Sequence, residues 1–145
     1  MDWMPFEEEA QILFHSQEID YELQTQEKYQ SWITEILTKE HKTCGTINYI
    51  FCDDDYLLEK NQAYLQHDTL TDIITFEYSK EPISGDIFIS IDRVKENAAE
   101  RNLPFDQELH RVMAHGVLHL CGYGDKKEEE QKVMRSKEEA CIAMF

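Results

Sequence analysis

The chain has 145 residues, enough for one compact domain with a single hydrophobic core. A hydrophobic fraction of 41% excludes a disordered chain, and the short apolar runs exclude a membrane-spanning helix, so no membrane association is expected. The formal net charge of −16 repels polyanions at long range, and any nucleic-acid-binding function has to overcome that repulsion.

The amino terminus and the cysteines bear on the cellular compartment. The first residues, MDWMPFEEEAQ, lack the basic region and apolar stretch of a secretion signal. The four cysteines include no C-x-x-C pair, and free buried thiols are the ordinary state of cysteine in a chain that is not exported. We therefore expect a cytoplasmic protein.

Hydrophobic periodicity predicts strands mixed with helices along the whole chain. In chain order, the expected elements are a strand at 10–16, a helix at 25–39, a strand at 45–52, a short helix at 56–64, strands at 71–78 and 86–91, and helices at 93–102, 106–121 and 127–143.

Turn-forming residues predict where several of these elements begin and end. The aspartates at 53–55 supply turn and N-cap chemistry for the short helix that follows them. Pro82, Ser84 and Gly85 are expected to break the chain between two strands, and Gly122 to end the helix before it.

The mixture of strands and helices predicts an α/β (α+β) layer fold. The short separation of strands 71–78 and 86–91 predicts an antiparallel pair, so we expect a mixed, about four-stranded sheet packed against helices. No internal repeat or low-complexity linker divides the chain. We expect one domain over residues 1–145.

A candidate metal site lies in the C-terminal half. His115 and His119 are four residues apart on a predicted helix, so both imidazoles project from one face. Gly122 ends the helix, and Gly124 allows the chain to turn back and offer Asp125 as a third ligand. Two imidazoles and a carboxylate suit Zn²⁺, and three protein ligands leave a fourth position open, which is typical of catalytic sites. The sequence thus predicts one zinc ion and hydrolysis by an activated water.

Other candidate residues fit structural roles. His110 lies elsewhere on the same helix, and is expected to be structural or to support a ligand. Cys121 points away from the histidine face, and we interpret it as a buried thiol. His67 could line a cleft, but we favour a position at the surface. The basic residues at 126–137, Arg135 among them, alternate with glutamates and predict a solvated helix face.

Three segments of the sequence resemble a known family. Residues 115–125, HGVLHLCGYGD, resemble the signature H-G-x-L-H-L-x-G-Y-D-H of the YbeY family of bacterial rRNA maturation factors. Residues 61–76, NQAYLQHDTLTDIITF, resemble the family's N-x-x-Y-R-x-x-D-x-x-T-D-V-L-S-F block. Residues 85–91, GDIFISI, resemble its G-D-I-x-I block, and the three blocks occur in the family's order.

The resemblance implies a zinc-dependent endoribonuclease that cleaves single-stranded RNA in rRNA maturation and ribosome quality control. It implies precursor rRNA and the ribosome, or ribosome-associated proteins, as partners. His115 and His119 match the family's first two metal ligands, and Asp125 stands where the family has a third histidine. The resemblance identifies no general acid or base here, and the sequence predicts no oligomeric state.

Two departures from the family pattern bear on mechanism. Asp125 adds a negative charge to the ligand set, which weakens the Lewis acidity of the metal and alters metal preference. Leu65 occupies the position of the family's arginine, so no motif residue supplies a cation for the charge that develops in phosphodiester cleavage.

Two other functions therefore stay open. One is a metal-dependent hydrolase of another substrate, such as a peptide. Gly116 argues against it, because zinc proteases carry the glutamate base of H-E-x-x-H at that position. The other is a non-catalytic ribosome-assembly protein whose metal only stabilises the fold, which Leu65 and the acidic charge favour.

Overall fold

The computed structural model describes residues 10–65 and 71–145. Within these residues, four strands and five helices follow one another along the chain. They are β1 (Gln11–Gln17), α1 (Gln26–Lys39), β2 (Cys44–Cys52), α2 (Asp54–Leu65), β3 (Ile73–Lys80), β4 (Ile83–Ser90), α3 (Ile91–Glu100), α4 (Phe105–Leu120) and α5 (Glu128–Met144).

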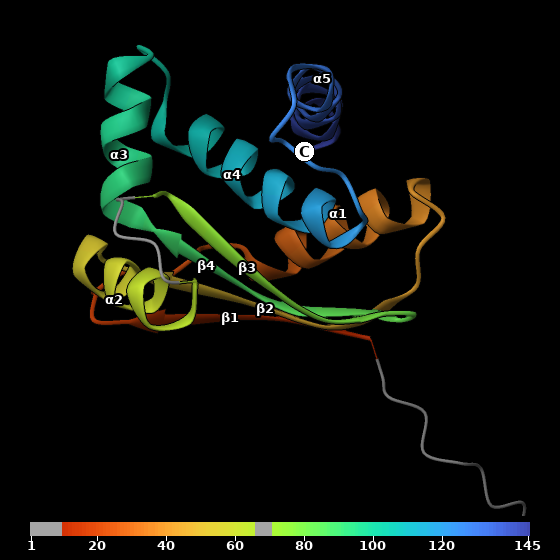
Figure 1. Ribbon diagram of the computed structural model, residues 1–145, viewed down its shortest axis with the longest axis horizontal. Coiled ribbons are helices and arrows are strands. Elements are labelled where there is room, and N and C mark those ends of the chain that lie inside the picture. The colour runs from red at the N-terminus through yellow and green to blue at the C-terminus, as the bar shows by residue number, and fades with distance from the viewer. Residues whose placement is uncertain (1–9, 66–70) are drawn as a thin grey trace, which may run out of the picture.

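The strands form one mixed sheet in the order β1-β2-β4-β3 (Figure 1). β1 pairs with β2, and β2 with β4, in parallel, whereas β3 and β4 are antiparallel. A tight turn at Glu81 and Pro82 joins β3 to β4. The predicted α/β fold class, the mixed four-stranded sheet and the antiparallel pair are confirmed.

The prediction that Ser84 and Gly85 break the chain is wrong, because both residues lie inside β4. A Cβ atom on Gly85 would lie 2.5 Å from the carbonyl oxygen of Phe76 and 3.0 Å from Cδ2 of Leu120 in α4. The glycine therefore leaves room for the backbone of β3 and for Leu120 of α4, and only Glu81 and Pro82 form the turn.

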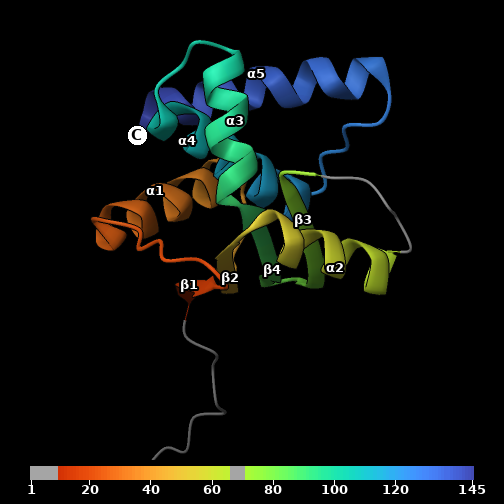
Figure 2. The same ribbon diagram turned by 90° about the vertical axis from the view of Figure 1, so that its left-hand side faces the viewer.

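The two faces of the sheet carry different layers, because alternate residues of a strand point to opposite sides. Tyr49 and Phe51 of β2 join the main core beneath α1 and α4, whereas Ile50 packs with Leu57 of α2 in a smaller cluster. Figures 1 and 2 place α1, α4 and α5 together on one side of the sheet. No helix among the described residues is long and apolar enough to cross a membrane.

Helix α4 is held against the sheet by a hydrogen bond and by close packing. The Tyr49 hydroxyl, which is fully buried, donates to the carbonyl of Met113 at 2.9 Å. Gly116 faces the sheet in the next turn, and a Cβ atom there would lie 2.7 Å from Cγ2 of Ile87 and 3.0 Å from Cδ1 of Ile73. The helix backbone can approach the sheet this closely only because residue 116 has no side chain.

The variant Gly116→Ala tests this contact. Alanine favours a helix over glycine by up to about 1 kcal/mol, but the added methyl should overpack the core at a cost of about 1–3 kcal/mol. We expect a net fall in the free energy of unfolding, measured by urea denaturation. In an Ile87→Ala background the methyl has room, so the same substitution should cost less there. An equal cost in both backgrounds would contradict the contact.

Candidate metal centre

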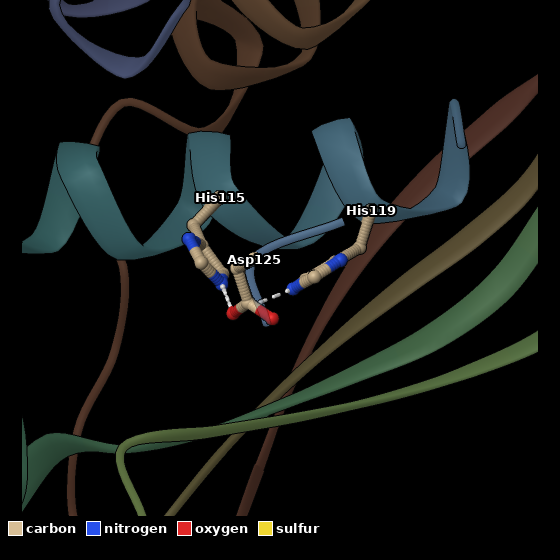
Figure 3. Close-up of side chains that lie close together, drawn as sticks. All are labelled: His115, His119 and Asp125. Carbon is tan, nitrogen blue, oxygen red and sulfur yellow. Dashed lines mark hydrogen bonds and ion pairs between the residues drawn. The ribbon is translucent and has the colours of Figure 1, made fainter. Parts of the chain in front are cut away.

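The C-terminal end of α4 positions the three predicted ligands. His115 and His119 lie one turn apart on the same face of the helix (Figure 3). The helix ends in a left-handed residue, Gly122 at φ 108°, whose N–H donates to the carbonyl of His119 at 2.9 Å. The chain then turns back and places Asp125 below the two imidazoles.

The structure brings these three side chains together. Oδ2 of Asp125 lies 3.1 Å from Nε2 of His115 and 3.2 Å from Nε2 of His119. One ligand atom from each residue lies within 4.8 Å of the others, and the three side chains are each partly buried. Separations near 3 Å are those expected between ligands about 2 Å from a shared ion.

Hydrogen bonds to Nδ1 of His115 and His119 determine which ring nitrogen carries the proton and leave Nε2 facing the site. Nδ1 of His119 lies 2.8 Å from the carbonyl oxygen of Tyr123, which can only accept, so the neutral ring carries its proton there. Nδ1 of His115 likewise donates to Oε2 of Glu138 at 2.6 Å. When both rings are neutral, each inner Nε2 atom therefore carries a lone pair directed toward the same carboxylate oxygen of Asp125. Three electron-rich atoms around one point fit a divalent cation of the zinc type.

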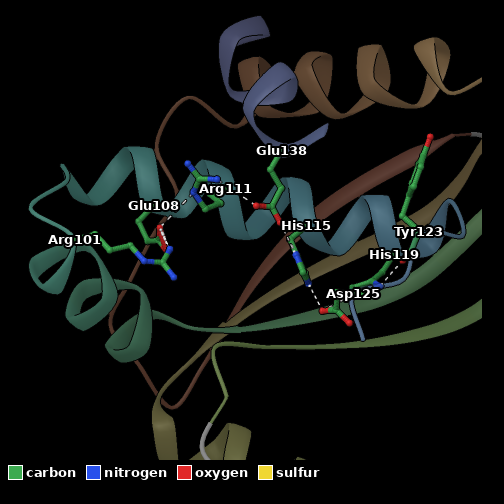
Figure 4. Close-up of polar contacts among 8 residues, drawn as sticks. All are labelled: Arg101, Glu108, Arg111, His115, His119, Tyr123, Asp125 and Glu138. Atoms are coloured by element: carbon green, nitrogen blue, oxygen red, sulfur yellow. Dashed lines mark hydrogen bonds and ion pairs between the residues drawn. The ribbon is translucent and has the colours of Figure 1, made fainter. Parts of the chain in front are cut away.

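Glu138 of α5 bonds to a candidate ligand, and the sequence interpretation did not include it. Its side chain is buried, 7% of the residue being exposed, and it accepts from both His115 and Nη1 of Arg111, the latter at 3.3 Å (Figure 4). A carboxylate behind a ligating histidine fixes the ring orientation and raises its basicity. The sequence could have indicated this residue, because Glu138 lies at helical spacing between the apolar residues Met134 and Cys141 on the buried face of the last helix.

The surroundings of His115 favour its protonated form. Burial alone lowers the pKa of this imidazole, but the hydrogen bond and charge of Glu138, together with the charges of Asp125 and Asp72, outweigh it. The pKa of His115 is therefore raised above its ordinary value of 6.5. The same negative charges attract a proton or a metal ion, so the two compete for Nε2.

A cleft of about 450 Å³ opens beside His115. Its lining includes Asp72 at the start of β3, whose carboxyl pKa is raised by burial and partly lowered again by His115. At its far end Nη1 of Arg101 contacts both oxygens of Glu108 at 2.9 Å, although Glu108 is only 1% exposed. The sequence interpretation singled out none of these three side chains as part of the site.

Other residues considered from the sequence lie outside the metal cluster. Nε2 of His110 lies 3.0 Å from the Tyr29 hydroxyl, and the ring packs on Phe145, so its predicted structural role is confirmed. Cys121 is a free, partly buried thiol, and burial raises its pKa to about 11, which disfavours the thiolate needed for ligation. Gly116 packs against the sheet and leaves no room for a glutamate base.

Two residues of the second family block cannot be placed. His67 and the side chain of Leu65 lie outside the described residues. Their expected roles stay predictions.

The variant Glu138→Gln tests the support of His115. An amide oxygen still accepts from Nδ1, but the negative charge is lost, so zinc affinity should fall by about 10- to 100-fold. Competition with a chromophoric chelator measures the affinity. Glu139→Gln on the same helix is the matched control, because Glu139 is exposed, and its affinity should equal that of the wild type. Equal affinities in all three proteins would contradict the role of Glu138.

Zinc affinity should also depend on pH. Because the pKa of His115 is raised, proton competition at Nε2 should begin at a higher pH than for a free imidazole, and zinc affinity should fall as the pH is lowered through that raised pKa. Glu138→Gln removes the largest group that raises this pKa, so the decline should move to lower pH. Chelator competition at several pH values measures both curves, and coincident curves would contradict the assignment.

Comparisons with known proteins agree with the fold and the motifs. Residues 11–145 match the family model described as Endoribonuclease YbeY. The chain is 54% identical over 129 residues to the Endoribonuclease YbeY of Flavobacterium psychrophilum, covering 88% of this chain and 92% of that protein. It is 47% identical to that of Cytophaga hutchinsonii, covering 94% and 96%. The solution structure of TM1509 from Thermotoga maritima superposes with a TM-score of 0.66 at 29% identity, covering 92% of this chain and 88% of that one. The chain belongs to the endoribonuclease YbeY family.

Proposed function

We propose that this protein is an endoribonuclease that binds one zinc ion through His115, His119 and Asp125 and cleaves single-stranded regions of precursor rRNA. The observation that carries the proposal is the convergence of two imidazole Nε2 atoms and one carboxylate oxygen on a single point. The family's name supports the choice of RNA as substrate. Association with the ribosome and a cytoplasmic location are part of the same proposal.

The residues around the ion would hold it and orient it. When bound, zinc supplies an activated water and polarises a phosphate oxygen. Glu138 and the Tyr123 carbonyl keep the two imidazoles in the tautomer that presents Nε2. Asp72 lines the same cleft as His115, and its raised pKa lets this carboxyl exchange a proton closer to neutral pH than an exposed aspartate does.

The environment of Gly116 disfavours the peptidase alternative. A metallopeptidase of the H-E-x-x-H type needs a glutamate on the helix face that meets the ion, and residue 116 faces Ile87 and Ile73 in the core instead. The ribosome-assembly alternative, in which the metal only stabilises the fold, makes a different prediction for variants of the ligands.

The double variant His115→Ala/His119→Ala should contain no bound zinc and should not cleave single-stranded RNA, because two of the three ligands are gone. Metal analysis of protein purified without an affinity tag, and gel assays on a precursor rRNA fragment, measure the two effects. His15→Ala is the control, since His15 is exposed on β1 and bonds to Asn48 outside the site.

Three outcomes separate the alternatives. Normal zinc content in the double variant would contradict the ligand assignment. Zinc in the wild type without cleavage of RNA would contradict the nuclease. If chelation then lowered the unfolding temperature of the wild type by many degrees, a purely stabilising ion would be favoured.

A further inference from the structure

The arginines of this chain are concentrated in one place. The chain has four arginines, and three of them, Arg101, Arg111 and Arg135, line the cleft beside His115. Its ten lysines all lie in the described residues, and none of them lines this cleft. In a chain of net charge −16 this selective placement calls for an explanation. Arginine differs from lysine in its planar fork of donors, which matches the oxygens of a phosphate.

Two of the three arginines are already engaged by buried carboxylates. Arg101 contacts both oxygens of Glu108, and Arg111 lies between Glu108, at 3.8 Å, and Glu138, at 3.3 Å (Figure 4). These pairs balance the two acidic side chains that are buried in the cleft wall. These arginine–glutamate contacts connect to the metal cluster, because Glu138 also bonds to His115.

Arg135 is different. It is exposed on α5, one turn before Glu138, and its side chain forms no hydrogen bond or ion pair with any other described residue. Its charge is therefore available to a ligand in the cleft, whose other wall carries His115. Two acidic groups of the lining are left to oppose it: Asp72, whose pKa is raised by burial, and Glu139, which is exposed four residues after Arg135 on α5.

We propose that this cleft is a phosphate subsite for single-stranded RNA, in which the guanidinium of Arg135 binds a phosphate next to the one that reaches the metal. The subsite rests on the proposed function. The paired arginines shape the wall, and Arg135 supplies a guanidinium that no carboxylate binds directly. The volume of about 450 Å³ lies in the range of pockets that hold small ligands, so a nucleotide unit fits its size. Glu139 at the rim opposes the phosphate.

Binding at low and high salt tests the subsite directly. The probe is a fluorescein-labelled hexanucleotide with 2′-O-methyl riboses, checked on a gel to stay intact, and the readout is fluorescence anisotropy with the zinc-loaded protein. Arg135→Ala should weaken binding about tenfold, the fold-change expected for one charge-assisted hydrogen bond. It should also reduce the slope of log Kd against log salt by about 0.7, as expected for one lost contact to a single-strand phosphate.

Matched variants separate a local contact from a general charge effect. Lys132→Ala removes the same charge three residues earlier on α5, from a side chain that is 74% exposed and does not line the cleft, and should leave affinity and slope unchanged. Arg135→Lys should keep the slope but bind more weakly than the wild type, because the fork is lost. Glu139→Gln should tighten binding. In cleavage assays, Arg135→Ala should raise KM and leave kcat near the wild-type value.

Each outcome has a separate meaning. If Arg135→Ala and Lys132→Ala change binding equally, or if neither changes it, the subsite is wrong while the nuclease stands. If the zinc-loaded wild type binds the probe but cleaves no RNA, the proposed function fails and the subsite survives. If it neither binds nor cleaves RNA, both fail. Equal zinc content and unfolding temperature in all variants confirm that the comparison is between folded proteins.

Discussion

The contact of α4 with the sheet is the constraint on which the rest of the structure depends. Gly116 lies against Ile87, and the buried Tyr49 hydroxyl holds the helix through the carbonyl of Met113. The helix is thereby fixed in height and rotation, so that His115 and His119 present their imidazoles to one point on the sheet side of α4 (Figure 3). α5 then crosses α4 and brings Glu138 behind the first of them. One helix thus belongs to the core and to the candidate metal centre at once.

Features that depend on local sequence were predictable. The strand and helix periods, the stop at Gly122 and the four-residue spacing of His115 and His119 are all properties of contiguous residues. The return of the chain to Asp125 was predictable because two glycines and a short segment leave little alternative. From the sequence, Gly116 could be recognised only as the position where the glutamate base of H-E-x-x-H is absent. Its physical role in packing depends on Ile87, which lies 29 positions earlier in the sequence, and no local pattern links the two.

Features that depend on the meeting of distant helices were not predictable. Glu138 of α5 accepts hydrogen bonds from Arg111 and His115 of α4, and these bonds exist only because α5 lies across α4. Arg135 is exposed, as expected for a solvated helix face, but the same crossing also makes it part of the lining of the cleft. Ser84 and Gly85 were misread as a break, because a glycine that admits Leu120 has the same local appearance as a glycine in a turn.

Tyr123 gives the candidate centre a property of its own. Its carbonyl accepts from His119, while its hydroxyl donates to Glu40 at 2.7 Å, beyond the end of α1, and Glu40 in turn pairs with Lys137 of α5 at 3.1 Å. The short segment that carries the carboxylate ligand is therefore clamped between two helices by its own residues. The ligand groups are therefore already in position, and binding of a cation would require little ordering of the backbone.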